Sequence, residues 1–498
     1  MAVHNSQFAT YKLPRIVRGS APAAANIASP TDLRHWTNPG VAVILLGLAV
    51  LAVARSIQPD DWRVAGTLIG LSGLPLIPVI RRVFRQSTLN LLSDHFFVLA
   101  VAFLIYNVFG ALLIPFGPQD QAEAALSYYS MDAQMALRVT AVNCIGFGIA
   151  LSVGSVVGRS WISAWARKAI GFGSFISPHW IMILFLLIGG ASSIYVFRFD
   201  LYLEPGIVAG AVRTLSNLLL VAIMMAAAYQ GRSSRWLLTG AVFLTALQAV
   251  GGLLLLSKSS VLLPIVALCV GLIWRFGIRR VIVPGLLTLL GVFLLIGSPI
   301  NSARNSGGLS GEIDLDQRTD ILREGVLDPT GTITEESYQP WARLCYLPAQ
   351  AAAIDLYDAG RGGNDYDLMA WSFLPRFLFP TKPIMTTSGT DFYEKLTGRN
   401  TTSVGQGVFV DGYYNLGWWG LIAVGIAVGG MLAWTSAFAS VVYRARSTLW
   451  LPIALAGSLM AFRVDGSFLV DYWGLFVLSV YVSLAGAMLH TLVSRRHV

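Results

Sequence analysis

The hydrophobic residues of this chain are concentrated in long continuous runs separated by short polar connections. A helix needs about 20 mostly apolar residues to cross the hydrocarbon core of a bilayer. Twelve runs come close to that length, namely 40–56, 64–80, 95–116, 137–157, 178–197, 208–229, 236–256, 259–275, 281–299, 417–442, 448–462 and 473–492. The pattern predicts an all-α polytopic membrane protein with about twelve transmembrane helices. The run at 448–462 is short and the run at 208–229 contains Arg213, so these two spans rest on the weakest pattern.

The composition agrees with this prediction. The chain of 498 residues is 55% hydrophobic and only 12% charged, whereas soluble domains carry about 25% charged residues. Its three cysteines, Cys144, Cys269 and Cys345, are far apart in sequence, which excludes a disulfide framework and a cysteine-based metal site. Residues 1–39 are polar, and we expect no cleavable signal peptide there.

The basic residues predict the orientation of the spans, because loops on the cytoplasmic side are enriched in Lys and Arg. With the N-terminus inside, every cytoplasmic turn is basic, as shown by Arg81, Arg82, Arg85, Arg159, Arg167, Lys168, Arg232, Arg235, Arg275, Arg279, Arg280, Arg444 and Arg446. We therefore expect both termini in the cytoplasm. The chain divides into a cytoplasmic tail (1–39), spans one to nine (40–299), a large outer loop (300–416), and spans ten to twelve with a short cytoplasmic tail (417–498).

The outer loop is the only extramembrane region long enough to build a site. Its second half is rich in aromatic residues, which a disordered segment does not need. A helix is expected over 342–358, with a kink or break at Pro348. A second helix is expected over 388–397, ending at Gly398. The apolar stretch 371–380 is too short to span and should lie in the interface of the outer leaflet.

Few standard catalytic motifs are present. The chain contains no Walker loop, HExxH, CxxC or GxSxG sequence, and its six histidines all map to the predicted cytoplasmic side. An outer site must therefore rely on carboxylates, Tyr, Lys and Arg. This pattern gives no reason to expect a metal or another cofactor, and the scattered basic residues do not indicate nucleic-acid binding.

Several outward cations are candidate anion ligands. Arg213 lies inside a predicted span, where a charge normally has a partner or a polar cavity. Lys258 is in a tight turn with three serines, and Arg304 follows span nine directly. We expect these three to converge on one lipid-pyrophosphate pocket, since guanidinium groups bind phosphate oxygens bidentately. The alternatives are structural ion pairs and contacts with lipid headgroups; for Arg463, an ion pair with Asp465 or Asp471 is the simpler interpretation.

Aromatic residues near the start of span ten are a further candidate feature. Tyr413, Tyr414, Trp418 and Trp419 would stack on sugar rings at such a site. The alternative is strong, because Trp and Tyr populate membrane interfaces in general.

Two stretches of the chain resemble a known family. Residues 374–383 read Leu-Pro-Arg-Phe-Leu-Phe-Pro-Thr-Lys-Pro, and residues 408–420 read Val-Phe-Val-Asp-Gly-Tyr-Tyr-Asn-Leu-Gly-Trp-Trp-Gly. Together with the Lys258 turn and the placement of the long loop, they resemble the bacterial O-antigen and oligosaccharide repeat-unit polymerases. Asp411 stands where this family more often has Glu. The resemblance covers the number of spans, the placement of the long loop and about 30 motif residues.

The resemblance implies a metal-independent glycosyltransferase with a GT-C-like membrane architecture in the bacterial inner membrane. Its donor and acceptor would be oligosaccharides linked to undecaprenyl pyrophosphate, and a chain-length regulator and a flippase would be partners in the pathway. Asp411 is the candidate base, with Asp365 and Asp367 as alternatives. The candidate ligands of pyrophosphate or sugar are Arg213, Lys258, Arg304, Arg376, Lys382, Tyr413, Tyr414 and Arg463.

Two other functions stay open at this point. One is a ligase-type glycosyltransferase of the same architecture, although related ligases usually place a histidine in the outer loop and this chain has none there. The other is a transporter of lipid-linked oligosaccharides, for which repeat symmetry and broken spans would be expected.

Overall fold

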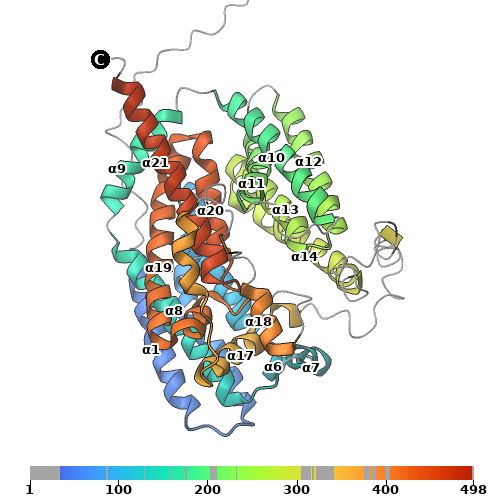
Figure 1. Ribbon diagram of the computed structural model, residues 1–498, viewed down its shortest axis with the longest axis vertical. Helices are drawn as coiled ribbons and strands as arrows, with labels where there is room; N and C mark the ends of the chain where they lie inside the picture. The colour runs from blue at the N-terminus through green and yellow to red at the C-terminus, as the bar shows by residue number, and fades with distance from the viewer. Residues whose placement is uncertain are drawn as a thin grey trace, which may run out of the picture.

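The computed structural model describes residues 34–85, 88–127, 129–157, 159–173, 177–201, 210–230, 233–303, 341–374, 388–398 and 404–495, together with Asp316, Thr319, Asp320, Arg323, Phe379, Lys382 and Pro383. Throughout this part of the chain the regular elements are helices (Figure 1). Eight of these helices are long and apolar enough to cross a membrane. The protein is therefore an all-helical polytopic membrane protein.

Helices occupy all twelve predicted ranges. The N-terminal ones are α1 (Thr37–Ala54), α2 (Trp62–Ser72) with α3 (Ile77–Phe84), α5 (His95–Phe103) with a π-helical turn (Leu104–Phe109), and α8 (Ala133–Val156). The middle ones are α10 (Pro178–Leu201), α11 (Gly210–Ala228), α12 (Ser234–Leu254), α13 (Lys258–Phe276) and α14 (Ile278–Ala303). The last are α19 (Val408–Ala445), α20 (Leu451–Phe462), and α21 (Gly474–Arg495) after a π-helical turn (Phe468–Trp473). The count of twelve membrane crossings stays a prediction.

The helices form two groups that lie side by side (Figure 1). Helices α10 to α14 make one group, and the other contains α1, α8 and α19 at its centre. Helices α1 and α8 approach closely, since a Cβ added at Gly148 would lie 2.6 Å from the carbonyl oxygen of Gly40. Small residues allow such close backbone contact between membrane helices. The central group is therefore tightly packed around α8.

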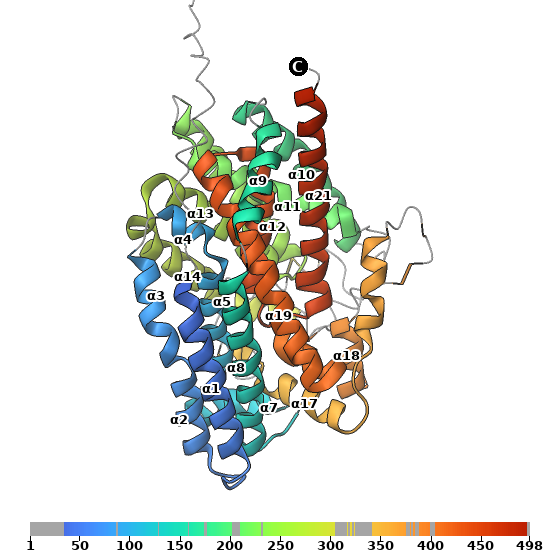
Figure 2. The same ribbon diagram turned by 90° about the vertical axis from the view of Figure 1, so that its left-hand side faces the viewer.

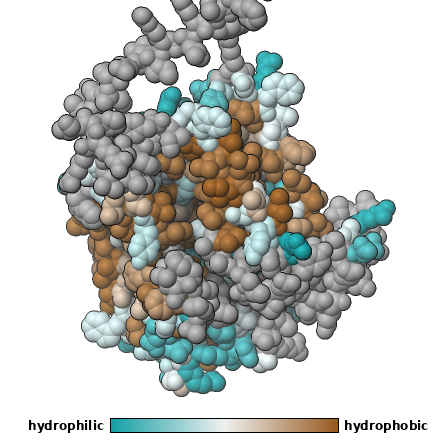
Figure 3. Space-filling view, turned by 45° about the horizontal axis from the view of Figure 1, so that its top comes forward, coloured by the Kyte–Doolittle hydropathy of each residue, from teal (hydrophilic) through white to brown (hydrophobic). Residues whose placement is uncertain are grey.

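The surface of the molecule is largely apolar. Figure 3 shows a broad hydrophobic band across the middle of one face, with hydrophilic residues gathered below it. Leu187 on α10, Phe243 on α12 and Leu287 on α14 are among the exposed apolar side chains. Such a surface is stable in contact with lipid tails and unstable in water.

Helix α19 contains a sharp bend. Its backbone leaves helical geometry at Leu416 and at Gly417, where φ is 62°. The chain turns so tightly that a Cβ at Gly420 would lie 2.0 Å from the carbonyl oxygen of Gly412. The predicted start of span ten at 417 thus coincides with this bend, but residues 408–415, assigned to the loop, are helical.

The connection after span three meets the described part of the large loop at one end of the molecule (Figure 2). The loop contributes a short 3₁₀ turn (Ala342–Leu344), α17 (Leu347–Asp358), a 3₁₀ helix (Asp365–Phe373) and α18 (Ser388–Thr397). The connection after span three contributes α6 (Leu113–Phe116) and α7 (Gln119–Leu126). The two parts are joined where the Trp341 indole N–H donates to the Phe109 carbonyl at 2.8 Å.

Turns predicted to be cytoplasmic meet at the opposite end. The Arg444 guanidinium donates to the Asn90 side chain of α4 (Thr88–Ser93), and the Gln230 amide donates to the Arg275 carbonyl, both at 3.3 Å. Each of these two hydrogen bonds joins turns that the basic residues assign to the same side of the membrane. Which end faces the cytoplasm stays a prediction.

Two local expectations need correction. Residues 159–173, taken as a connection, form α9 (Arg159–Gly173), which packs against α19 and α21 through Ile162, Ala166 and Ala169. Pro348 does not kink a helix, because α17 begins at Leu347 and the proline occupies its first turn, where its missing N–H is not needed. The helix expected at 388–397 is confirmed as α18, with Gly398 at φ +70° just after it.

Candidate functional site

The first segment of α19 places Asp411 at the end of the bundle where the large loop lies. Its side chain is only 1% exposed. Its Oδ2 accepts a hydrogen bond from the Tyr366 hydroxyl at 3.1 Å and another from the Phe468 backbone N–H at 3.0 Å. Asp411 therefore joins the loop, α19 and the π-helical turn before α21.

Asn415 extends this network by one helical turn. Its amide donates to the Asp411 carbonyl at 3.0 Å, and its Oδ1 accepts from the Asp365 backbone N–H at 2.9 Å. The Ser388 hydroxyl in turn donates to Asp365 Oδ2 at 2.5 Å, which fixes the start of α18. Burial, with Asp411 close by, raises the pKa of Tyr366 well above its ordinary value, so the hydroxyl stays protonated and donates.

A second network surrounds Tyr413. The Arg138 guanidinium donates to the Tyr413 hydroxyl at 2.9 Å, and that hydroxyl donates to Asp358 Oδ1 at 3.0 Å. Arg138 also forms an ion pair with Asp358, with 2.5 Å between Nη2 and Oδ2. Three elements, α8, α17 and α19, are thus held together by one guanidinium.

The neighbouring Tyr414 fixes α18. Its hydroxyl accepts from the Lys395 ammonium at 3.1 Å, and its ring packs edge-on against Phe392 at 5.5 Å between centroids. Tyr413 and Tyr414 therefore both serve the contact between α19 and the loop, in different directions.

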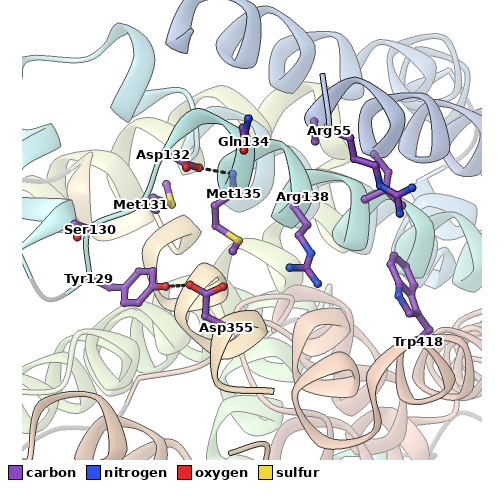
Figure 4. A pocket seen from close by; sticks show the side chains of 12 residues that line it. Arg55, Tyr129, Ser130, Met131, Asp132, Gln134, Met135, Arg138, Asp355 and Trp418 are labelled. Atoms are coloured by element: carbon purple, nitrogen blue, oxygen red, sulfur yellow. Dashed lines mark hydrogen bonds between the residues drawn. The ribbon is translucent and has the colours of Figure 1, made fainter. Parts of the chain in front are cut away.

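A pocket with a volume of about 680 Å³ lies beside the Tyr413 network (Figure 4). It is lined by the end of α1, the segment before α8, the first turns of α8, one residue of α17 and Trp418 of α19. Its lining residues are Leu51, Ala54, Arg55, Tyr129, Ser130, Met131, Asp132, Gln134, Met135, Arg138, Asp355 and Trp418. The mixture of Asp, Arg, Gln, Tyr and Trp is suited to a hydroxylated, partly apolar ligand such as a sugar.

The acidic residues of the pocket have defined roles. Asp132 caps α8 by accepting from the Met135 N–H at 2.7 Å. Asp355 of α17 accepts a hydrogen bond from the Tyr129 hydroxyl, as Figure 4 shows. Asp355 is thus a carboxylate that lines the pocket and is held in place by a neutral donor.

Arg463 belongs to a separate cluster close to Asp411. Its Nε lies 3.9 Å from Asp471 Oδ1, so the ion pair considered as the simpler interpretation is present. Asp471 also accepts from the Ser467 N–H at 3.0 Å. Burial raises the pKa of Asp465 above its ordinary value, while Arg463 acts in the opposite direction. The structure therefore gives Arg463 a role in holding the turn between α20 and α21.

Of the three cations expected to converge on a pyrophosphate, two are described. Helices α11 and α13 run parallel, because Gly271 contacts the backbone at Met224 and Arg275 meets Gln230. Arg213 precedes Gln230 by as many residues as Lys258 precedes Arg275, so Arg213 and Lys258 lie at a similar height along the two parallel helices. Arg213 is exposed, and the Lys258 ammonium lies 5.9 Å from the Phe293 ring centroid on α14. Their convergence stays a prediction, and Arg304 lies outside the described residues.

The remaining candidates are placed as follows. Arg376 lies outside the described residues. The Lys382 ammonium donates to the Leu374 carbonyl at 3.0 Å. Asp367 is exposed, and its backbone N–H donates to the Asn364 carbonyl at 3.2 Å. The structure therefore brings Asp411, Asp365, Tyr413 and Tyr414 into one region, whereas Lys382 has a local contact in the loop.

The sequence interpretation missed several residues that line the pocket or bind Asp411, Tyr413 and Tyr414. They are Arg55, Tyr129, Arg138, Asp355, Asp358, Tyr366 and Lys395. Arg138 carried a usable signal, because it lies in the second turn of α8 and a charge inside a span needs a partner. The same reasoning that selected Arg213 applies to it.

No group of three His, Cys, Asp or Glu side chains is placed to hold a metal ion in the part of the chain that the structure describes. Comparison of the chain with protein family models, with curated proteins and with solved structures returned no match.

Proposed function

We propose that the protein is a glycosyltransferase that polymerises undecaprenyl-pyrophosphate-linked oligosaccharide repeat units at the outer face of the bacterial inner membrane. Twelve spans, cytoplasmic termini and a GT-C-like arrangement are part of this proposal. The observation that carries it is the pocket of about 680 Å³ beside the motif residue Tyr413, lined by Arg138, Asp355 and Trp418.

The pocket offers the groups that glycosyl transfer requires. The reaction passes through an oxocarbenium-like transition state, and a positioned carboxylate accelerates it by taking a proton from the acceptor hydroxyl. Pyrophosphate is a good leaving group, and cations stabilise the charge that develops on it. We assign the sugar of the acceptor to the pocket and keep Arg213, Lys258 and Arg304 as the proposed ligands of the donor pyrophosphate.

Asp355 is the better-placed base. It lines the pocket, whereas Asp411 is 1% exposed and its Oδ2 is occupied by Tyr366 and Phe468. A base must come within hydrogen-bond distance of the proton that it removes. We therefore assign proton removal to Asp355, and we assign to Asp411 the positioning of the loop and α19.

The test is the profile of lipid-linked glycans in cells that lack the gene and carry a plasmid copy. Without the protein, single repeat units accumulate; with the wild-type copy, a ladder of polymer returns. Asp355→Asn should lower polymer formation by about a hundredfold or more. Asp120→Asn is the matched control, since Asp120 is an exposed acid on α7 outside the pocket.

The two alternatives give different profiles. Long lipid-linked polymer in the deleted strain means a ligase, and it contradicts the proposal. Repeat units that stay on the cytoplasmic side of the membrane mean a transporter, and they contradict it equally.

A further inference from the structure

Two adjacent tryptophans differ in their surroundings. Trp419 is 80% exposed, as expected of a residue that anchors a helix in the membrane interface. Trp418 is 39% exposed, lines the pocket, and packs edge-on against Tyr413 with 5.3 Å between ring centroids. Only Trp418 therefore has a fixed orientation next to a cavity.

The support behind Trp418 is rigid. The Tyr413 hydroxyl is held between Arg138 and Asp358, so the ring against which Trp418 packs is fixed at its far end. A large flat side chain that is fixed in this way gives a ligand ring a contact surface at little cost in conformational entropy.

The charges around the pocket are separated. Figure 4 shows Tyr129 and Asp355 on one side and Arg55 and Trp418 on the other. Asp132 caps α8, Asp355 accepts from Tyr129, and Arg138 is paired with Asp358. Arg55, at the end of α1, is exposed and lines the same pocket. The side of the pocket that holds the indole thus also holds a guanidinium.

We infer that the pocket binds an acidic sugar, with the pyranose ring stacked on Trp418 and its carboxylate on Arg55. Guanidinium binds carboxylate through two parallel hydrogen bonds, and the hydroxyls of the sugar meet the acceptor oxygens of Asp355 on the opposite side. The inference rests on the proposed function and names its acceptor class: a repeat unit that presents a hexuronic acid.

The experiment measures binding to the full-length protein in lipid nanodiscs by calorimetry. The probes are a galacturonic acid trisaccharide and the corresponding neutral galactose trisaccharide. The acidic glycan should bind about tenfold more tightly, as one charge-assisted contact predicts. Arg55→Gln should remove this preference, and Trp418→Ala should weaken the binding of both glycans several-fold.

Matched controls exclude a general surface effect. Arg63→Gln alters an exposed arginine at the start of α2, outside the pocket, and Trp419→Ala alters the neighbouring indole. Both variants should bind like the wild type. The preference of the wild type for the acidic trisaccharide should be equal in nanodiscs of neutral and of anionic lipid. Loss of this preference in anionic lipid identifies Arg55 as a contact of lipid headgroups and overturns the inference.

Equal binding of the two glycans, no binding of either, or a preference that survives Arg55→Gln also overturns it. Equal binding leaves the polymerase proposal intact, because the glycan ladder in cells is measured independently. Conversely, an acidic preference without a ladder refutes the polymerase proposal alone.

Discussion

Two substitutions of Asp411 distinguish a catalytic base from a residue that only positions the loop and α19. The two roles predict opposite results for Asp411→Asn. In Asp411→Ala, the Tyr366 hydroxyl and the Phe468 N–H both lose their acceptor. Both donors belong to largely buried residues, and an unsatisfied buried donor costs about 1–3 kcal/mol. We therefore expect a loss of about 2–6 kcal/mol in the free energy of unfolding, from these two bonds alone.

In Asp411→Asn, one side-chain oxygen remains. Placed at the position of Oδ2, it accepts from both Tyr366 and Phe468. The new amide then lies near the Asn415 amide, where the contact in the native protein is already long at 3.4 Å. The expected loss is about 1 kcal/mol or less, comparable to one ordinary hydrogen bond.

The assay is the apparent melting temperature of the purified protein in nanodiscs, together with the glycan ladder of the same variants in cells. We expect Asp411→Asn to melt close to the wild type and to keep most of its polymer formation. Asp411→Ala should have a lower melting temperature and should lose polymer formation. An Asp411→Asn protein that melts like the wild type but makes no polymer refutes the positioning role and identifies Asp411 as the base.

Three further predictions concern the rest of the fold. Gly110→Ala should lower the melting temperature strongly, because its Cβ would lie 2.0 Å from a backbone carbonyl oxygen of the loop, whereas Gly70→Ala on α2 has free space and should be neutral or stabilising. Burial raises the pKa of Asp465, so this group stabilises the fold fully below the ordinary pKa of Asp, and the contribution is lost as the pH rises through the raised pKa. The melting temperature of Asp465→Asn should therefore rise relative to that of the wild type as the pH increases. A difference in melting temperature that does not change with pH contradicts this prediction. Cys345 is 5% exposed and burial raises its pKa to about 12, so an impermeant maleimide should leave this thiol unmodified. The same reagent should modify the exposed cysteine of the Arg361→Cys variant in intact cells. Labelling of that variant only after permeabilisation refutes the predicted orientation.

The fold was largely readable from the sequence because apolar run length and basic turns are local signals. They predicted ranges that helices do occupy in the structure, whereas the number of membrane crossings and the side of each connection stay predictions. What they could not show is helical structure in polar or mixed segments. α9 was missed because its buried face is only a few small and aliphatic residues wide, and residues 408–415 were missed because they contain Asp411, Tyr413 and Asn415.

The site was only partly readable. Motif resemblance selected the segment with Asp411, Tyr413 and Tyr414, which the structure places at the centre of two networks. The partners of these residues come from distant parts of the chain, such as Arg138 on α8 and Asp358 on α17. No local pattern links residues so far apart in sequence, and the pocket arises only when α1, α8, α17 and α19 pack together.

The bend in α19 has a consequence for how the bilayer acts on the protein. The short segment that carries Asp411 and Tyr413 continues directly into the long one, and the backbones of Gly412 and Gly420 are in contact across the turn. No flexible linker separates the two segments, so a tilt of the long segment, or its shift along the membrane normal, moves Asp411 and Tyr413 with it. Helices adjust their tilt when the hydrocarbon thickness does not match their length. We therefore expect bilayers of graded acyl-chain length to shift Asp411 and Tyr413, and with them to change the proposed polymerisation, while every residue of the pocket stays the same.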